Sequence, residues 1–255
     1  MAPNRVHAWR WSLTLRRRYE ILAGTGCTVL SVIVCSIDPR KQQAIRGEYQ
    51  RAIGEPHEFI LIDDARSLCE GYNRGFAQSC GEIVVFSHDD IEIHSRQLGA
   101  LLGEALKKLD LLGVAGTSRL AGAWWHAAGR PYLHGRIIHN VKGRRQLDYF
   151  GPPSDRLVAL DGVFFAARRA VCAALPFDEV TFDGFHLYDL DFSHRAFLSG
   201  FKVGILDIDV THYSEGSFDS QEWRRYAQRF LAKHRRSIRA KPARYDEPQW
   251  TVTPL

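Results

Sequence analysis

The stretch Gly81-Glu82-Ile83-Val84-Val85-Phe86-Ser87-His88-Asp89-Asp90 decides the fold. Four apolar residues in a row, bounded by a glycine and by acids, are typical of a short strand buried on both faces of a parallel sheet. The paired carboxylates stand directly after its carboxyl end, where ligands bind in such sheets. The same order recurs upstream, where the predicted strand from His57 to Ile62 ends in Asp63-Asp64. Two strands that each deliver two acids to one edge indicate a ligand site there.

Working outward from these strands, the chain alternates strands with helices. The further elements that we expect in the first half are a strand at 28–36, a helix at 40–53, a helix capped by Ser67 that runs to Ser79, a helix opened by Ser95 and a strand at 111–115. This alternation predicts right-handed βαβ units. We therefore expect an α/β fold with a Rossmann-like, mostly parallel central sheet and helices on both faces.

The second half is less regular. Residues 117–155 are rich in Gly, Trp, His and Arg, and we expect them to form an insertion that lies over the pocket. Beyond it, the pattern predicts strands at 157–166 and 203–207 and helices at 168–174, 187–198 and 220–238. The last of these helices is amphipathic.

Composition limits the classes of protein that fit. The 255 residues are 45% hydrophobic and 25% charged, which favours a soluble globular chain over a disordered one. The net charge of +5 comes from Arg16-Arg17-Arg18 and from residues 224–244. This distribution suits a phosphate, a membrane surface or nucleic acid, and equally a solvated basic face. The five cysteines form no Cys-x-x-Cys pair, so we expect reduced thiols in a cytoplasmic protein.

One segment resembles a signal peptide or a membrane anchor. The apolar run from Ile21 to Ile37 follows three arginines. However, Gly24-Thr25-Gly26 interrupts the run, and its second half has the composition of a buried parallel strand. We therefore interpret it as the first strand of the sheet.

Several side chains carry candidate chemistry, each with a structural alternative. Asp89 and Asp90 are suited to Mg²⁺ or Mn²⁺, although a solvated turn uses the same residues. His212 follows another predicted strand and is either a third ligand or a structural histidine. Asp189 and Asp191 begin a predicted helix, where a carboxylate is either favoured by the helix dipole or available as a general base.

Taken together and in this order, the segments resemble the GT-A glycosyltransferases, especially the inverting group that includes bacterial polysaccharide and antigen synthases. The resemblance covers about residues 28 to 235. Each segment alone is a weak signal, and their order is what makes the resemblance specific. The segments that carry it are Leu30-Ser31-Val32-Ile33-Val34, Glu58-Phe59-Ile60-Leu61-Ile62-Asp63-Asp64, Tyr72-Asn73-Arg74-Gly75, the Gly81 to Asp90 stretch, Asp161-Gly162-Val163-Phe164-Phe165-Ala166-Ala167-Arg168-Arg169, Tyr188-Asp189-Leu190-Asp191, Gly200-Phe201-Lys202-Val203 and the strand before His212.

The resemblance implies how the donor would be bound. Asp63 and Asp64 match the acidic pair that contacts the nucleobase, typically uracil, and Asn73 falls where a helix approaches the nucleotide. Asp89 and Asp90 resemble the Asp-x-Asp motif of the family. The first would lie near the ribose and the second on the metal, which a histidine often completes.

The resemblance also implies roles on the acceptor side. Asp189 matches the catalytic base, and His212 matches the histidine of the metal site. Trp124, Trp125, Asp161 and Asp191 are the expected acceptor contacts, and the two tryptophans would stack on sugars unless they belong to the buried core.

Three positions depart from the family pattern. Cys35-Ser36-Ile37-Asp38 replaces a Thr-Tyr-Asn-like turn, and Ala65-Arg66-Ser67 replaces Gly-Ser-Thr-Asp after the second strand. Both bear on nucleobase specificity. Tyr188 replaces the glutamate that usually precedes the catalytic aspartate, while Asp189 itself is retained.

The resemblance predicts a metal-dependent glycosyltransferase that moves a sugar from a nucleotide-diphosphate donor, a UDP-sugar, to an acceptor hydroxyl with inversion. Mn²⁺ or Mg²⁺ would be the cofactor, and a carbohydrate or glycolipid the acceptor, as in polysaccharide biosynthesis. We expect a cytoplasmic protein, with peripheral contact to the inner face of the membrane as an option. The alternative is a catalytically silent nucleotide-sugar-binding or partner-binding subunit with the same fold. No RNA-binding motif accompanies the basic helix, so no nucleic acid is expected.

The expected organisation is a single catalytic domain with two flanking segments. Residues 1–27 would be a basic N-terminal extension and residues 239–255 a C-terminal tail. The domain at 28–238 would comprise a nucleotide-binding half at 28–116, an acceptor and metal half at 117–218, and a C-terminal amphipathic helix at 219–238.

Overall fold

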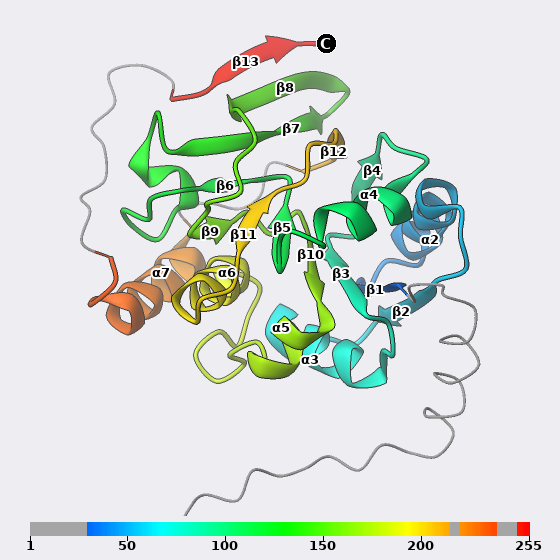
Figure 1. Ribbon diagram of the computed structural model, residues 1–255, viewed down its shortest axis with the longest axis horizontal. Helices are drawn as coiled ribbons and strands as arrows, with labels where there is room; N and C mark the ends of the chain where they lie inside the picture. Colours follow the sequence, from blue (N-terminus) through cyan, green and yellow to red (C-terminus); the bar gives the residue numbers. More distant parts are fainter. Residues whose placement is uncertain (1–29, 215–219, 239–248) are drawn as a thin grey trace, which may run out of the picture.

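The computed structural model in Figure 1 describes residues 30–214, 220–238 and 249–255. The predicted basic extension at 1–27 and residues 239–248 of the predicted tail lie outside the described residues.

The first half forms the predicted strand–helix–strand units. In order, these are β1 (Leu30–Cys35), α2 (Pro39–Ile53), β2 (Glu58–Ile62), α3 (Leu68–Gln78) and β3 (Ile83–Ser87). Both helices begin at side-chain caps, which satisfy a backbone donor that has no partner within the helix. Asp38 accepts a hydrogen bond from the backbone N–H of Arg40 at 2.8 Å. Ser67 accepts one from the backbone N–H of Glu70 at 3.1 Å.

The two helices cover opposite faces of the sheet. β1 pairs in parallel with β2 on one side and with β3 on the other, so the two crossovers run in opposite directions. Right-handed connections then place α2 and α3 on opposite faces. The packing agrees, because Tyr49 of α2 packs on Phe59, whereas Gly75 of α3 lies against Ile33. A Cβ at Gly75 would come within 2.3 Å of Ile33 Cγ2, so the close approach of α3 requires glycine.

The central sheet is mostly parallel, as predicted. In the described residues its order is β11-β5-β10-β3-β1-β2. The three strands from the second half are β5 (Leu111–Gly113), β10 (Phe164–Arg168) and β11 (Val203–Ile205). β10 is antiparallel to β3 and to β5, and β11 is parallel to β5. One strand therefore runs against the other five, and the carboxyl ends of β1, β2 and β3 meet at one edge.

The remaining helices lie close to their predicted positions. They are α4 (Leu98–Ala105), α5 (Arg169–Ala174), α6 (Tyr188–Leu198) and α7 (Gln221–His234). α4 begins at Leu98 rather than at Ser95, because the Ser95 hydroxyl accepts from the Gln97 N–H in the turn before the helix. α7 is amphipathic as predicted and buries Tyr226 and Phe230.

A second sheet replaces the irregular insertion that the sequence predicted at 117–155. Its main path is β13-β8-β7-β12-β4, and β6 joins β7 to β9. The elements are β4 (Ile91–Ile93), β6 (Ala115–Thr117), η1 (Trp125–Ala128), β7 (Leu133–Val141), β8 (Arg144–Gly151), β9 (Ala159–Leu160), β12 (Val210–His212) and β13 (Thr251–Pro254). The expectation that this region covers the pocket is confirmed, since its strands line the cavity. Its hairpin of β7 and β8 was missed because these strands, Leu133–Val141 and Arg144–Gly151, lack a clean alternation of apolar and polar residues.

One hydrophobic cluster runs through both sheets, from Val85 on β3 to Phe150 on β8 and Phe230 on α7. Cys35, Cys69, Cys80 and Cys172 are free thiols. Among the helices of the described ranges, none has the length and apolar character needed to cross a membrane.

Candidate functional site

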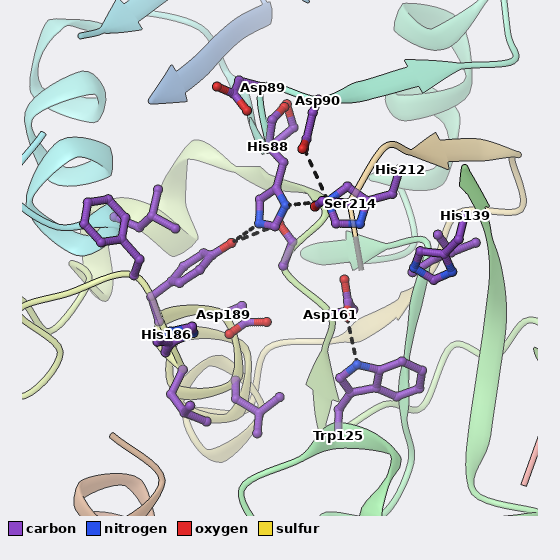
Figure 2. Close-up of a pocket in the computed structure, with 18 of the residues that line it drawn as sticks. His88, Asp89, Asp90, Trp125, His139, Asp161, His186, Asp189, His212 and Ser214 are labelled. Atoms are coloured by element: carbon purple, nitrogen blue, oxygen red, sulfur yellow. Dashed lines mark hydrogen bonds and ion pairs between the residues drawn. The ribbon is translucent and has the colours of Figure 1, made fainter. Parts of the chain in front are cut away.

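A cavity of about 1230 Å³ opens between the two sheets. The ends of β1 and β3 line it from the central sheet, and η1, β7, β8 and β12 line it from the second sheet. Small-molecule pockets in proteins typically measure about 300–1,000 Å³, so this one has room for two substrates. Figure 2 shows its residues in three groups. His88, Asp89, Asp90 and His212 lie at one end, Trp125 lies at the other, and Asp161 and Asp189 lie between them.

The first group is His88, Asp90 and His212, whose ligand atoms all lie within 4.8 Å of one another. His88 Nδ1 is 3.0 Å from His212 Nε2, which is 3.3 Å from Asp90 Oδ1. Strand pairing explains the convergence. His88 and Asp90 follow β3 directly, β4 begins at Ile91, and β12 pairs antiparallel to β4 with His212 opposite Ile91. The predicted partners Asp90 and His212 are therefore brought together, and His88 joins them.

The protonation states of this group suit a metal. Burial and the neighbouring His212 lower the pKa of His88 to about 4, which leaves a neutral imidazole with a lone pair to donate. Burial opposes the charge of Asp90, but His212, His88 and Lys41 outweigh it and hold the pKa of Asp90 well below its ordinary value. One carboxylate and two imidazole nitrogens are a donor set that Mn²⁺ and related divalent ions accept. The residues present therefore fit a divalent metal, with positions left for substrate oxygens.

Asp89 lies beside this group and has different partners. Its carboxylate accepts a hydrogen bond from the Ser36 hydroxyl at 2.6 Å and forms an ion pair with Lys41 at 3.2 Å. The same ammonium is 3.3 Å from Asp90. Lys41 therefore neutralises part of the acidic pair, and the two carboxylates raise the pKa of Lys41 against the effect of its burial. Sequence reasoning did not single out Lys41, which lies one turn into α2.

Asp189 lines the cavity from the first turn of α6. Burial raises the pKa of Asp189 to about 7, and the nearby negative charge of Asp161 adds to the shift. Gly162 makes the arrangement possible, because a Cβ there would lie 2.4 Å from the Tyr188 hydroxyl and 2.9 Å from Asp189 Oδ2. A carboxyl group poised near neutral pH in a cavity is suited to accept a proton.

Tyr188, which precedes Asp189 in the chain, reaches the His88–Asp90–His212 group through its hydroxyl. Its hydroxyl donates to the Gly162 carbonyl at 3.1 Å and lies 2.9 Å from His88 Nε2. The Tyr188 hydroxyl and the two imidazoles of His88 and His212 thus form one chain of hydrogen bonds. This chain fixes the orientation of the His88 ring, as outer partners of ligating histidines do.

The aromatic end of the cavity contains the predicted tryptophans. Trp125 Nε1 donates to Asp161 Oδ2 at 2.8 Å, and its ring meets Phe150 edge-on with centroids 4.7 Å apart. Trp124 lies 5.1 Å from Trp223 of α7, again between ring centroids. Trp124, Trp125 and Asp161 all line the cavity. Trp223 and Trp250 line it as well, and sequence reasoning did not place either of them there.

A basic hairpin also reaches the cavity. Lys142 and Arg144, at the turn between β7 and β8, line it together with His139 and Asp148. His139 Nδ1 is 2.7 Å from Asp148 Oδ2, and its ring centroid is 5.9 Å from that of His212. The sequence signal that could have placed these residues in the cavity is the spacing of Gln146 and Asp148 on one strand, with His139 opposite Gln146 on the other. It was missed because the strands themselves were not predicted.

Four predicted site residues lie outside the residues that line the cavity. Asp63 and Asp64 are exposed at the end of β2, where Asp64 pairs with Arg74 at 2.6 Å. Asn73 is held by the backbone of Phe177, donating to its carbonyl and accepting from its N–H, both at 2.9 Å. That amide fixes the segment before α6 rather than facing a ligand.

Asp191 is the fourth. It is buried, with Arg195 at 2.7 Å, Lys233 at 2.6 Å and His234 at 2.8 Å around its carboxylate. These partners lie on α6 and α7, so the carboxylate holds the two helices together. The acceptor contact implied for Asp191 therefore has no support in this geometry.

Comparison with known proteins shows the family of the chain. Residues 31–234 match the family described as "Glycosyltransferase like family", and no curated protein matches. The chain is similar to the crystal structure of GalNAc-T7 with UDP, GalNAc and Mn²⁺ at 11% identity and a TM-score of 0.49, covering 80% of this chain and 48% of that one. It is also similar to A197 from STIV at 7% identity and a TM-score of 0.43, covering 73% of this chain and 86% of that one. The chain thus spans about half the length of the first of these structures, and at such values neither likeness carries a functional argument. The family match, which extends over most of the sequence, shows that this chain belongs to the glycosyltransferase-like family.

Proposed function

We propose that the chain transfers a sugar from a UDP-sugar to a hydroxyl of a carbohydrate or glycolipid acceptor, with a divalent metal as cofactor and with inversion. The observation that supports this most is the composition of one cavity. It holds a His88–Asp90–His212 group suited to a metal and, beside it, Asp189 with a pKa of about 7. A protein that only bound a nucleotide sugar would have no use for a carboxyl group poised to accept a proton.

His88, Asp90 and His212 would hold the metal, Mn²⁺ or Mg²⁺. When bound, such an ion neutralises the charge that develops on a departing nucleotide diphosphate. Neighbouring residues of the chain contact the two histidines. Tyr188 orients the His88 ring through its hydroxyl at 2.9 Å, and Ser214 Oγ lies 3.0 Å from His212 Nε2.

Asp189 would act as general base toward the acceptor hydroxyl. Its oxygen takes the hydroxyl proton while the acceptor oxygen attacks the anomeric carbon, the bond from that carbon to the donor diphosphate breaks, and UDP leaves. Attack from the face opposite the departing diphosphate inverts the anomeric centre. Asp161 supports the role because its charge disfavours ionisation of Asp189 and so raises its proton affinity. Base catalysis of this type contributes about 10²–10⁴-fold to rate.

The nucleotide would lie toward the ends of β1 and β2. Ser36, Ala65 and Leu68 line the cavity there, and Asp89 stands beside Ser36. Asp89 is well placed to contact a ribose hydroxyl. Asp63 and Asp64 directly precede Ala65, and a nucleobase contact by Asp64 would require its ion pair with Arg74 to open. For Asn73, whose amide is fully engaged, we propose an indirect role through the Phe177 segment.

The cellular setting that we propose is polysaccharide assembly in the cytoplasm, against the inner face of a membrane. Arg224, Arg225 and Arg235 are exposed on and just beyond α7 and would face anionic lipid headgroups. Sedimentation with vesicles of anionic lipid tests this setting, because binding should weaken as salt rises. Equal recovery with anionic and neutral vesicles would contradict it.

Calorimetric titration with UDP and with GDP, each with Mn²⁺ and with chelator, tests the donor site. We expect UDP to bind in the presence of Mn²⁺ and to lose affinity in chelator, and we expect His88→Ala to behave like the chelated wild type. A matched control is His57→Ala, because His57 lies at the surface with one hydrogen bond, from Nδ1 to the Glu55 carbonyl. If neither nucleotide binds, the partner-binding alternative replaces this proposal. If GDP binds in place of UDP, the nucleobase assignment fails and the transferase assignment stands.

A further inference from the structure

The C-terminal strand β13 forms part of the wall of the cavity. It pairs antiparallel with β8, with Thr251 opposite Tyr149 and Val252 opposite Asp148, at the outer edge of the second sheet (Figure 1). Extending this register by one residue sets Trp250 beside Phe150, and their ring centroids are 5.5 Å apart. Both residues line the cavity. The end of the chain therefore delivers a tryptophan to the site from far along the sequence.

Arg130 fixes the position of Trp250 from both sides. Its Nε donates to the Gln249 carbonyl at 3.0 Å, and its Nη2 donates to the Thr251 hydroxyl at 2.8 Å. The Arg130 backbone N–H also donates to Gln249 Oε1 at 3.3 Å. These bonds hold the two residues that flank Trp250, so the indole is held by more than the strand pairing.

Trp250 completes a continuous group of rings. His126 lies 5.3 Å from Trp250 and 5.2 Å from Trp124, and Trp124 lies 5.1 Å from Trp223, all measured between ring centroids. These rings come from η1 and the residue before it, from α7, and from the residue before β13, and all of them line the cavity. We call Trp124, His126, Trp223 and Trp250 the aromatic wall.

The aromatic wall ends next to the reacting centre that we propose. Trp125, which follows Trp124 in sequence, donates to Asp161 at 2.8 Å, and Asp161 is the charged neighbour of Asp189. A ring held against the wall would thus lie beside the base. Gln146 and Asp148 lie on the same face of β8 as Phe150 and line the same cavity, so polar groups adjoin the rings.

We propose that the aromatic wall is the acceptor subsite, that its ligand is a pyranose ring, and that Trp250 is the residue that determines acceptor affinity. This inference rests on the proposed transferase function. A pyranose presents a face of C–H groups, which packs on an indole, and an edge of hydroxyls, which bonds with carboxylates and amides. Indole rings that are apolar on the face and polar at one edge suit such a ligand. An alkyl chain would bury its length against Gln146 and Asp148 without bonding to them, which disfavours a lipid in this place.

Saturation-transfer NMR with the full chain tests the proposal. The probes are methyl α- and β-pyranosides of glucose, galactose, mannose and N-acetylglucosamine, together with octyl β-glucoside, in the presence of UDP and Mg²⁺. We expect saturation on the ring protons of at least one pyranoside. Trp250→Ala should reduce its affinity about fivefold or more, in line with the contribution of an aromatic contact, and Trp250→Phe should restore most of it.

Two further variants separate the indole from the strand. Thr253→Ala changes a residue of β13 whose side chain points to the other face from Val252, and it should leave ring-proton saturation unchanged. Arg130→Ala should weaken pyranoside binding as Trp250→Ala does, because it releases both residues that flank the indole. UDP affinity, measured in the same samples, should be the same in all variants.

The outcomes distinguish this inference from the function on which it rests. Unchanged saturation in Trp250→Ala would overturn the inference, as would the absence of ring-proton saturation in the wild type with every pyranoside. Saturation confined to the alkyl protons of octyl β-glucoside would overturn it in favour of a lipid subsite. Failure of the wild type to bind UDP, with pyranoside binding intact, would refute the donor site and leave the aromatic wall as a sugar site. If Trp250→Ala alone loses UDP binding through misfolding, Trp250→Phe and Arg130→Ala decide the result.

Discussion

The two ends of the cavity are built in opposite ways. At the polar end, His88 and Asp90 follow one buried strand within three residues, and a short ladder brings His212 to them. At the aromatic end, Trp124 and Trp250 belong to segments far apart in the sequence, and Trp250 reaches the cavity through the pairing of β13 with β8 and the hydrogen bonds of Arg130. The polar end therefore takes two of its three residues suited to a metal from one local segment and the third from a long-range strand pairing, while the aromatic end depends on long-range packing throughout.

This difference matches the tasks that we propose for the two ends. A diphosphate carries charge that any nucleotide donor shares, so a metal and its ligands can sit on rigid strand ends. Acceptors differ in shape, and surfaces assembled from loops and terminal segments vary most easily between related proteins. Asp189 and Asp161 lie at the junction, where a hydroxyl held at one end meets a sugar held at the other (Figure 2).

The largest expected effect is at the junction. Asp189→Asn removes the proton acceptor while keeping the size of the side chain, so transfer should fall by about 10²–10⁴-fold. UDP affinity should not change, because the metal-ligating group is intact. Single-turnover kinetics and calorimetry on the same sample measure both. Asp155→Asn, at an exposed carboxylate in the loop before β9, is the matched control. Wild-type turnover in Asp189→Asn would remove the base assignment.

Gly162→Ala tests how closely the junction is packed. The added Cβ would meet the Tyr188 hydroxyl at 2.4 Å and Asp189 Oδ2 at 2.9 Å, so one of them must move. A displacement of about 1 Å at a reacting group costs about 10²-fold in rate. Gly103→Ala, in α4 with no atom within 4 Å of the new Cβ, should keep full activity. Equal rates for the two variants would show that Gly162 does not position the base.

The pH dependence of turnover reports the ionisation of Asp189. A carboxyl group accepts a proton only when ionised, so kcat should rise as the pH increases through about 7, the pKa of Asp189, and stay level above it. Asp161→Asn should move the midpoint to lower pH, because it removes a negative charge beside the base. Burial is the larger cause of the raised pKa, so the midpoint should remain above that of an ordinary aspartate. A profile that is flat from pH 5 to 9 would contradict the account.

The smallest expected effect is on the affinity of the polar end for Mn²⁺ when no nucleotide is bound. Lys41 forms ion pairs with both carboxylates, with its ammonium 3.2 Å from Asp89 and 3.3 Å from Asp90. Lys41→Met should tighten the binding of Mn²⁺ alone about two- to fivefold, the range that a partly exposed ion pair supports. Electron paramagnetic resonance of free Mn²⁺ measures this. Lys107→Met, which breaks an exposed pair with Glu104 on the surface, should leave Mn²⁺ affinity unchanged. Weaker binding in Lys41→Met would show that Lys41 supports the site.

The sequence predicted the polar end better than the aromatic one, for physical reasons. Apolar runs that end in acids specify both a parallel strand and the edge at which its acids lie, so Asp90 could be placed from the sequence. His88 precedes that pair directly and shares the same strand end, but in sequence a histidine at a strand end does not differ from a structural one. Trp250 could not be found, since nothing near it in sequence indicates which strand β13 joins.

The acceptor role predicted for Asp191 could have been rejected from helix geometry alone. Residues two apart on a helix point about 200° apart, so Asp189 and Asp191 cannot both face one cavity from α6. The structure places Asp189 in the cavity and Asp191 against α7. The strands β7 and β8 could not be predicted in this way. Their mixture of histidine, arginine and isoleucine shows no periodic pattern along either strand, and the residues form a common face only when the two strands pair.

The most direct test of the account is the release of UDP from a panel of UDP-sugars with methyl pyranosides as acceptors, measured with Mn²⁺ and with chelator for the wild type and for Asp90→Asn. The account predicts that at least one UDP-sugar is cleaved by the wild type in Mn²⁺, and that chelator and Asp90→Asn each abolish the release. UDP release that persists in chelator or in Asp90→Asn would contradict the metal-dependent donor site, and so would the absence of release from every donor.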